Sequence, residues 1–137
     1  MAIFVPMQAG QSGVVARISV AGNVFWHFLY AADGGELAKS GTTNQTHDFD
    51  LGSPEKLHLD VNAWHFVLMN PHPTPVQFTI GIQWVQAQQT IASWPPNGPK
   101  KGSVKPGEHV VLDDSAFLAV VPTEDAAAAV VAQQEEE

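Results

Sequence analysis

Hydrophobic and polar residues alternate along much of the chain with a period of two, which is typical of β-strands that bury one face. In residues 76–85, the even positions are aromatic or β-branched, whereas the odd positions up to 83 hold Gln, Thr and Gly. Residues 56–61 repeat the pattern, with two leucines and a valine on one face and Lys56, His58 and Asp60 on the other. Both segments predict strands of an antiparallel sheet with one solvent-facing side.

Two further segments are apolar on both faces. Residues 24–31 and 64–69 carry large apolar side chains at odd and even positions alike. Such strands are typical of the centre of a sandwich or of an interface within an assembly. His27 and His65 lie inside these segments, so we interpret them as core or interface residues rather than as ligands.

Turn residues separate the strands at short intervals. The Asp33-Gly34-Gly35 step predicts a hairpin, and residues 70–75, with three prolines, predict a loop. Further strands are expected at residues 2–8, 14–20, 36–40, 46–51, 109–112 and 116–121. Roughly eight to ten short strands predict an all-β fold, an antiparallel β-sandwich or jelly roll.

The chain of 137 residues has the length of one domain. We expect a single sandwich over residues 1–123. Residues 124–137 are rich in Ala and Glu and lack a broad apolar face, so they predict a short acidic tail, either a frayed helix or a disordered segment.

The middle of the chain has a distinctive order of segments. An aromatic strand, an Asp-Gly turn and a short strand precede Leu51-Gly52, which leads into apolar segments at residues 57–61 and 78–84. This order resembles that of the small jelly-roll domains appended to secreted bacterial peptidases, over about half of the chain. The resemblance implies an accessory module without catalytic activity. It has no specific motif, and no residue role is carried over from it.

The charge is unevenly distributed. Fourteen acids and six bases give a formal net charge of -8, and residues 124–137 hold five of the acids and no base, so the preceding residues carry only -3. This balance argues against nucleic acid as a partner, because phosphate binding needs clustered bases. Charged residues are only 15% of the chain. Together with the two doubly apolar strands, this predicts leftover apolar surface and a homo-oligomer.

Neither a signal peptide nor a membrane span is predicted. The amino-terminal residues lack the basic start and the apolar run of a secretory signal, and no stretch approaches the ~20 apolar residues of a membrane helix. We therefore expect a cytoplasmic protein by default, with export by another route as the open alternative. The absence of cysteine excludes disulfides and thiolate chemistry.

Four residues are candidate metal ligands. His47 and Asp48 are adjacent, and His58 and Asp60 would share one face of a strand. They are the best set for calcium or another divalent metal, but the sequence has no His-x-His pair and no spacing that places a third ligand. The simpler interpretation, which we favour, is a hydrogen-bonded surface pair and no cofactor.

Trp94 is the candidate for ligand binding. It precedes Pro95-Pro96 in a loop, where a rigid indole either forms a platform for sugar stacking or packs back over the edge of the sandwich. Asn97 and Asn70 are the candidate polar partners.

A non-catalytic binding or interaction module is therefore the favoured function. The module is expected to be homo-oligomeric, with a carbohydrate (lectin-like) or protein partner. Two alternatives stay open: a structural subunit of a phage or secretion particle, and a small His/Asp metal-dependent enzyme. An enzyme is disfavoured because the chain lacks a Gly-x-Ser-x-Gly elbow and a phosphate-binding loop.

Overall fold

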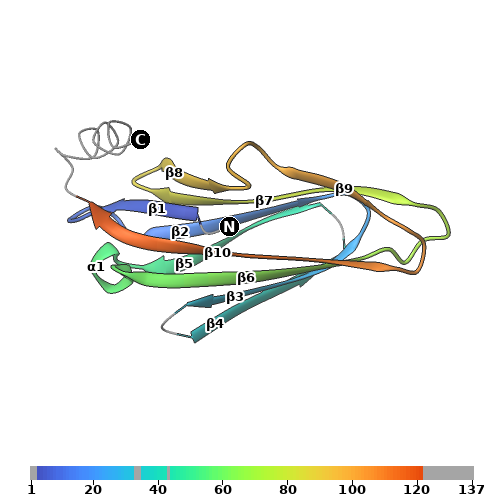
Figure 1. The fold of residues 1–137 in the computed structure, drawn as a ribbon, viewed down its shortest axis with the longest axis horizontal. Coiled ribbons are helices and arrows are strands. Elements are labelled where there is room, and N and C mark those ends of the chain that lie inside the picture. Colours follow the sequence, from blue (N-terminus) through green and yellow to red (C-terminus); the bar gives the residue numbers. More distant parts are fainter. Residues whose placement is uncertain (1–2, 33–34, 43, 122–137) are drawn as a thin grey trace, which may run out of the picture.

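The computed structural model describes residues 3–32, 35–42 and 44–121, and these form a two-layered β-sandwich (Figure 1). The strands are β1 (Ile3–Gln8), β2 (Val14–Ala21), β3 (Phe25–Ala32), β4 (Gly35–Gly41), β5 (Gln45–Gly52), β6 (Asp60–Met69), β7 (Val76–Gln86), β8 (Gln89–Trp94), β9 (Lys100–Val104) and β10 (His109–Val121). A single helical turn, α1 (Pro54–Leu57), precedes β6. The predicted tail at residues 124–137 lies outside the described residues.

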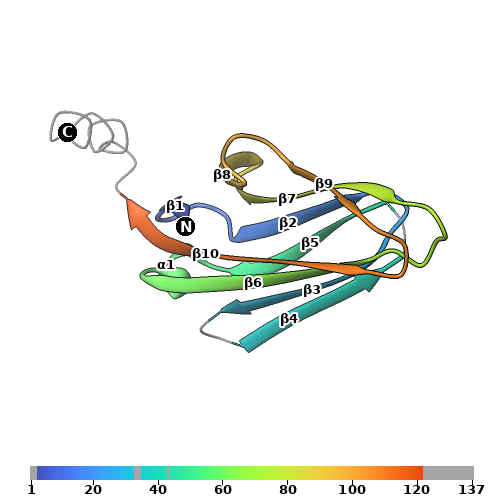
Figure 2. The same ribbon diagram turned by 45° about the vertical axis from the view of Figure 1, so that its right-hand side comes forward.

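The strands are divided equally between two sheets. Sheet A has the order β1-β10-β6-β3-β4, and sheet B has the order β5-β2-β7-β8 with β9 also paired to β7. Figure 2 shows β2, β7 and β8 of sheet B above β6, β3 and β4 of sheet A. The all-β sandwich is thus confirmed, although the strand order does not establish the jelly-roll topology. One pairing departs from the antiparallel expectation: β1 runs parallel to β10.

Inward-facing side chains of both sheets form one core, because strand residues alternate between the two faces. β2, β6 and β7 follow this alternation closely. Residues 24–31 and 64–69 lie almost wholly in β3 and β6 in the middle of sheet A, but the described chain covers only one of their faces, so of the two alternatives the interface within an assembly stays a prediction. In β3, Trp26 and Phe28 are buried, but Phe25 and His27 are exposed on the outer face, and His65 of β6 is exposed in the same way.

The predicted strand at residues 56–61 is wrong, because most of it is α1 and the turn after it. Ser53 caps the helix by accepting a hydrogen bond from the Lys56 N–H to its Oγ at 3.3 Å, and Pro54 occupies the first turn. Leu59 then adopts a left-handed backbone with φ of 64° and is 63% exposed. His58 and Asp60 therefore share no strand face, and the segment order behind the jelly-roll resemblance is broken here.

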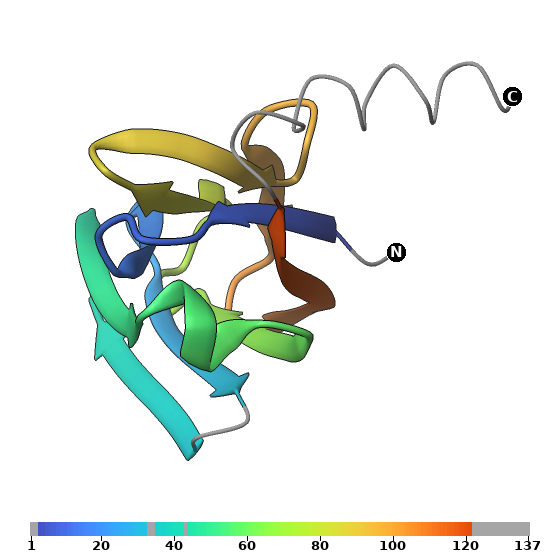
Figure 3. The ribbon, with the colours of Figure 1, turned by 90° about the vertical axis from the view of Figure 1, so that its left-hand side faces the viewer.

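A buried glutamine joins the two sheets along one side. Gln86, at the end of β7, accepts a hydrogen bond from the Gln8 N–H and donates to the Gln8 carbonyl oxygen, both at 2.9 Å, and to the Ser12 carbonyl oxygen at 3.1 Å. The Gln86 amide thus bonds to both backbone groups of Gln8, as a residue of a neighbouring strand would. Figure 3, viewed from the α1 end, shows β1 beside both β10 and the β7–β8 hairpin.

The described residues include no helix that is long and apolar enough to cross a membrane.

Candidate functional site

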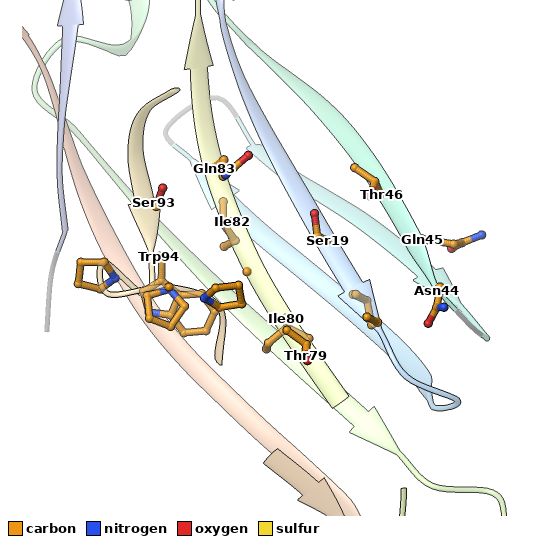
Figure 4. Close-up of a pocket in the computed structure, with 17 residues that line it drawn as sticks. Ser19, Asn44, Gln45, Thr46, Thr79, Ile80, Ile82, Gln83, Ser93 and Trp94 are labelled. Atoms are coloured by element: carbon orange, nitrogen blue, oxygen red, sulfur yellow. The ribbon is translucent and has the colours of Figure 1, made fainter. Parts of the chain in front are cut away.

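A hollow with a cavity volume of about 610 Å³ lies on the outer face of sheet B. We call it the sheet B groove. β2 and β7 form its floor, the start of β5 lies on one side, and the proline-rich residues 94–99 lie on the other (Figure 4). The register explains the floor, because Ser19 of β2 lies opposite Thr46 of β5 and opposite Gly81 of β7.

The groove combines apolar and neutral polar side chains and is uncharged. Of the 17 described residues that line it, none is ionisable. Neutral hydroxyl or amide side chains come from Ser19, Asn44, Gln45, Thr46, Thr79, Gln83 and Ser93. Such side chains donate and accept hydrogen bonds without carrying a net charge. The groove can therefore bind a ligand with many hydrogen-bonding groups, but it offers no counter-ion to a charged one.

The proline-rich wall rests on a glycine of the floor. A Cβ at Gly81 would lie 3.4 Å from the Trp94 carbonyl oxygen and 3.9 Å from the Pro99 Cα. A longer side chain would therefore push the wall away from the sheet. The wall is closed by a turn in which the Gly98 N–H donates to the Pro95 carbonyl oxygen at 3.3 Å. Three prolines restrict its backbone, so this side of the groove is preorganised.

Trp94 anchors this wall from inside the sandwich. Its side chain is buried and packs edge-on against Trp64, with ring centroids 5.4 Å apart, and parallel to Phe66 at 6.0 Å. The indole Nε1 donates to Asp114 Oδ2 at 2.9 Å. Of the two alternatives for Trp94, the structure shows the one in which the indole packs back onto the core. It borders the groove as a support rather than as an exposed platform.

Asp114 is held ionised by its hydrogen bonds. Burial by itself would raise the pKa of this carboxyl group, but hydrogen bonds, including those from the Ser115 N–H at 2.8 Å and from Trp94, outweigh burial and lower the pKa.

The two asparagines predicted as polar partners lie apart. Asn97 is exposed on the proline-rich wall but does not line the groove. Asn70 is fully buried in the β6–β7 connection. Its Nδ2 donates to the carbonyl oxygens of Thr74 and Val104 at 2.8 and 2.9 Å, and its Oδ1 accepts from the His72 N–H at 2.8 Å. Its amide therefore holds the loop in shape.

The four candidate metal ligands are distributed over both sheets. His47 and Asp48 lie on β5 of sheet B, whereas Asp60 begins β6 of sheet A and His58 precedes it. His58 Nδ1 accepts a hydrogen bond from the Val120 N–H at 2.9 Å, and Asp60 Oδ2 accepts one from Asn62 Nδ2 at 3.0 Å. Among the residues that the structure describes, no group of three or more His, Asp or Glu side chains is placed to hold a metal ion.

Asp48 has a different partner. Arg17 Nε and one terminal nitrogen donate to its two carboxylate oxygens at 2.8 and 3.2 Å. Because hydrogen bonding to the guanidinium favours the ionised form, the pKa of Asp48 is lowered and that of Arg17 is raised.

The exposed histidines of sheet A also pair locally. His27 Nδ1 lies 2.6 Å from Ser40 Oγ, and His65 Nδ1 contacts Asp113 Oδ1. A serine hydrolase would also need a carboxylate that orients the histidine. Within residues 3–32, 35–42 and 44–121, His27 has no such carboxylate partner.

Comparison with known protein families, with curated proteins and with solved structures found no significant match.

The groove residues themselves were missed by sequence reasoning. The signal was present: the outward positions of β2 and β7 include Ser19, Thr79 and Gln83, which are polar and uncharged. Only the register shows that they meet Thr46 from β5 on one surface. The pairing of β2 with β5 and β7 brings these residues, which are far apart in the chain, onto one surface.

Proposed function

We propose that this protein is a non-catalytic binding module whose sheet B groove takes a neutral carbohydrate. The observation that carries the proposal is the groove lining, which combines seven hydroxyl or amide side chains with no ionisable group among the described residues. Sugars present many hydroxyl groups, each able to donate and accept, and these match the chemistry of Ser, Thr, Asn and Gln.

The shape of the groove supports the same ligand class. Small-molecule sites usually measure ~300–1,000 Å³, and the groove, at about 610 Å³, has room for a mono- or disaccharide. Its floor belongs to paired strands and its wall is rich in proline, so little conformational entropy is lost on binding. The apolar ring edges of Pro95, Pro96 and Pro99 suit the C–H faces of a sugar ring.

Electrostatics favours a neutral ligand over an anionic one. The chain carries a formal net charge of -8, and no Lys, Arg or His belongs to the described lining. An anionic sugar would be repelled at long range and would find no counter-ion on arrival.

A glycan screen followed by titration calorimetry tests the proposal. Gln83→Ala removes a groove amide, whereas Gln77→Ala removes an exposed amide from the same strand outside the groove. A lost hydrogen bond contributes ~0.5–1.5 kcal/mol, so Gln83→Ala should weaken binding by about 2- to 12-fold. Gln77→Ala should bind like the unmodified protein.

Two results would overturn the proposal. One is a screen in which no neutral glycan binds, or in which only sulfated or sialylated glycans bind. The other is a neutral glycan whose affinity falls as much in Gln77→Ala as in Gln83→Ala.

A further inference from the structure

The large apolar side chains that remain exposed gather on one side of the molecule. In the part of the chain that the structure describes they are Phe4, Phe25, Leu59, Val61, Met69, Val111 and Phe117. Six of them belong to strands of sheet A, and Leu59 lies immediately before β6. None belongs to sheet B. The strands β6, β3 and β4 of sheet A lie along the lower side of the molecule in Figure 2, away from β7 and β8 of sheet B.

Strand register makes these residues neighbours rather than scattered positions. At one end of sheet A, Val61 lies opposite Phe117, which lies opposite Phe4, and the two phenylalanine rings stack with centroids 6.3 Å apart. At the other end, Met69 lies opposite Phe25. We call this surface the sheet A face.

The apolar surface extends from that second end toward the middle of the sheet A face. Val67 lies opposite Val111 on one side and opposite His27 on the other. The row that contains His65 and Asp113 separates this part of the face from Val61 and Phe117. Monomeric proteins rarely expose so many large apolar side chains on one face, so we look for an occupant of the face.

The polar groups on the sheet A face leave it without a strong charge of one sign. His65 pairs with Asp113, and His27 pairs with Ser40, all within the face. A contact between two identical surfaces is disfavoured when both carry an excess of the same charge, and the face carries few carboxylates, of which Asp113 contacts His65.

We propose that the sheet A face is the interface of a homodimer, occupied by a second copy of this chain in a two-fold arrangement. β6 has 10 residues, or ~34 Å at ~3.4 Å per residue, and five strands at ~4.8 Å give a width of ~24 Å, so the face measures roughly 800 Å². A stable interface buries ~800 Å² on each partner.

The face is also compatible with a two-fold axis. Consider a two-fold axis that lies in the plane between the two copies and runs perpendicular to the strands. Where it passes over His65, the central outward residue of β6, it exchanges the two ends of that strand. Met69 of each copy then lies against Val61 of the other, so apolar surface meets apolar surface at both ends, while His65 and Asp113 near the axis face their own copies. The interface is independent of the sheet B groove, which faces the other way.

Analytical ultracentrifugation of the full chain, from about 1 to 100 µM, tests the proposal. The expected result is a dimer. Val111→Glu introduces a carboxylate into the face from each copy, and two buried unpaired groups should raise the dimer dissociation constant by about 30-fold or more. Met69→Lys, at a second exposed position, should act in the same direction. Val85→Glu, an outward-facing valine of sheet B, is the matched control.

A wild-type protein that stays monomeric at 100 µM would refute the second copy as occupant. A dimer that Val85→Glu dissociates while Val111→Glu and Met69→Lys do not would move the interface to sheet B. Circular dichroism of each variant confirms folding. Glycan binding by a monomeric variant separates this proposal from the proposed function, because either can fail while the other holds.

Discussion

Replacing Gln86 by leucine should weaken the attachment of β1 to β7, while β1 stays paired with β10. The side chain makes three hydrogen bonds to backbone groups of Gln8 and Ser12, and only 3% of Gln86 is exposed. Leucine has a similar size but can make none of them. The N–H and carbonyl groups of Gln8 are half-buried and lose their partner, whereas Ser12 is exposed and water can replace the lost bond.

The expected decrease in the free energy of unfolding follows from the number of hydrogen bonds that Gln86 makes. Each is worth ~0.5–1.5 kcal/mol net, and discounting the one to Ser12 leaves about 1–3 kcal/mol in the free energy of unfolding. For a domain of this size, that loss lowers the melting temperature by about 3–12 °C. Chemical denaturation followed by tryptophan fluorescence measures the free energy, and amide hydrogen exchange at Gln8 should accelerate.

Gln89→Leu is the matched control, because Gln89 is exposed at the start of β8. It should change the free energy of unfolding by less than about 0.5 kcal/mol. If Gln86→Leu is as stable as this control and Gln8 stays protected from exchange, the account of Gln86 as a link between the sheets is wrong.

Two other predictions concern the groove and its support. Trp94→Phe keeps the aromatic packing but removes the indole N–H from Asp114, so it should cost about 1–2 kcal/mol near pH 7 and raise the pKa of Asp114. Because the folded-state pKa of this carboxyl group is lowered, its contribution is present above the unfolded value of about 3.9 and is lost as the pH falls through the folded value. Denaturation at pH 7 and at about pH 2 should therefore show a smaller cost in acid, and an equal cost at both would contradict the assignment. The affinity of the groove for a neutral glycan should be constant from about pH 6 to 9 and from about 0.05 to 0.5 M salt, since no described lining residue is ionisable. Calorimetry that shows a tenfold change would mean that a charged group takes part.

The strands were largely predictable because alternation is local. The segment expected at residues 76–85 is β7 (Val76–Gln86), and β3 and β4 pair antiparallel with Ala32 opposite Gly35. The failure at residues 56–61 has a local cause as well. The alternation over six residues is too short to distinguish a strand from a capped helical turn. Ser53 as the N-cap and Pro54 in the first turn favour the helical turn that the structure shows.

The candidate site was less predictable because its residues meet only through strand register. The sequence identified Trp94 as a notable residue beside the proline-rich segment. The inward orientation of its indole, however, depends on packing against Trp64 and Phe66 of the core. Asn70 looked like a ligand-binding loop residue, and its burial depended on carbonyl groups as distant as that of Val104. Sequence can identify such residues, but it does not say which of their atoms are already bonded.

The sequence by itself determined that this chain folds as strands with one apolar and one more polar face, because alternation with a period of two is a property of neighbouring residues. Only the tertiary structure decided which of those faces would be covered. Two sheets can bury only their inner faces against each other, so the apolar outer residues of β3 and β6 stayed exposed and the polar outer residues of β2, β5 and β7 gathered into a groove. Pairing Ser19 with Gly81 and Thr46 joins segments far apart in the chain, and no local pattern encodes that choice.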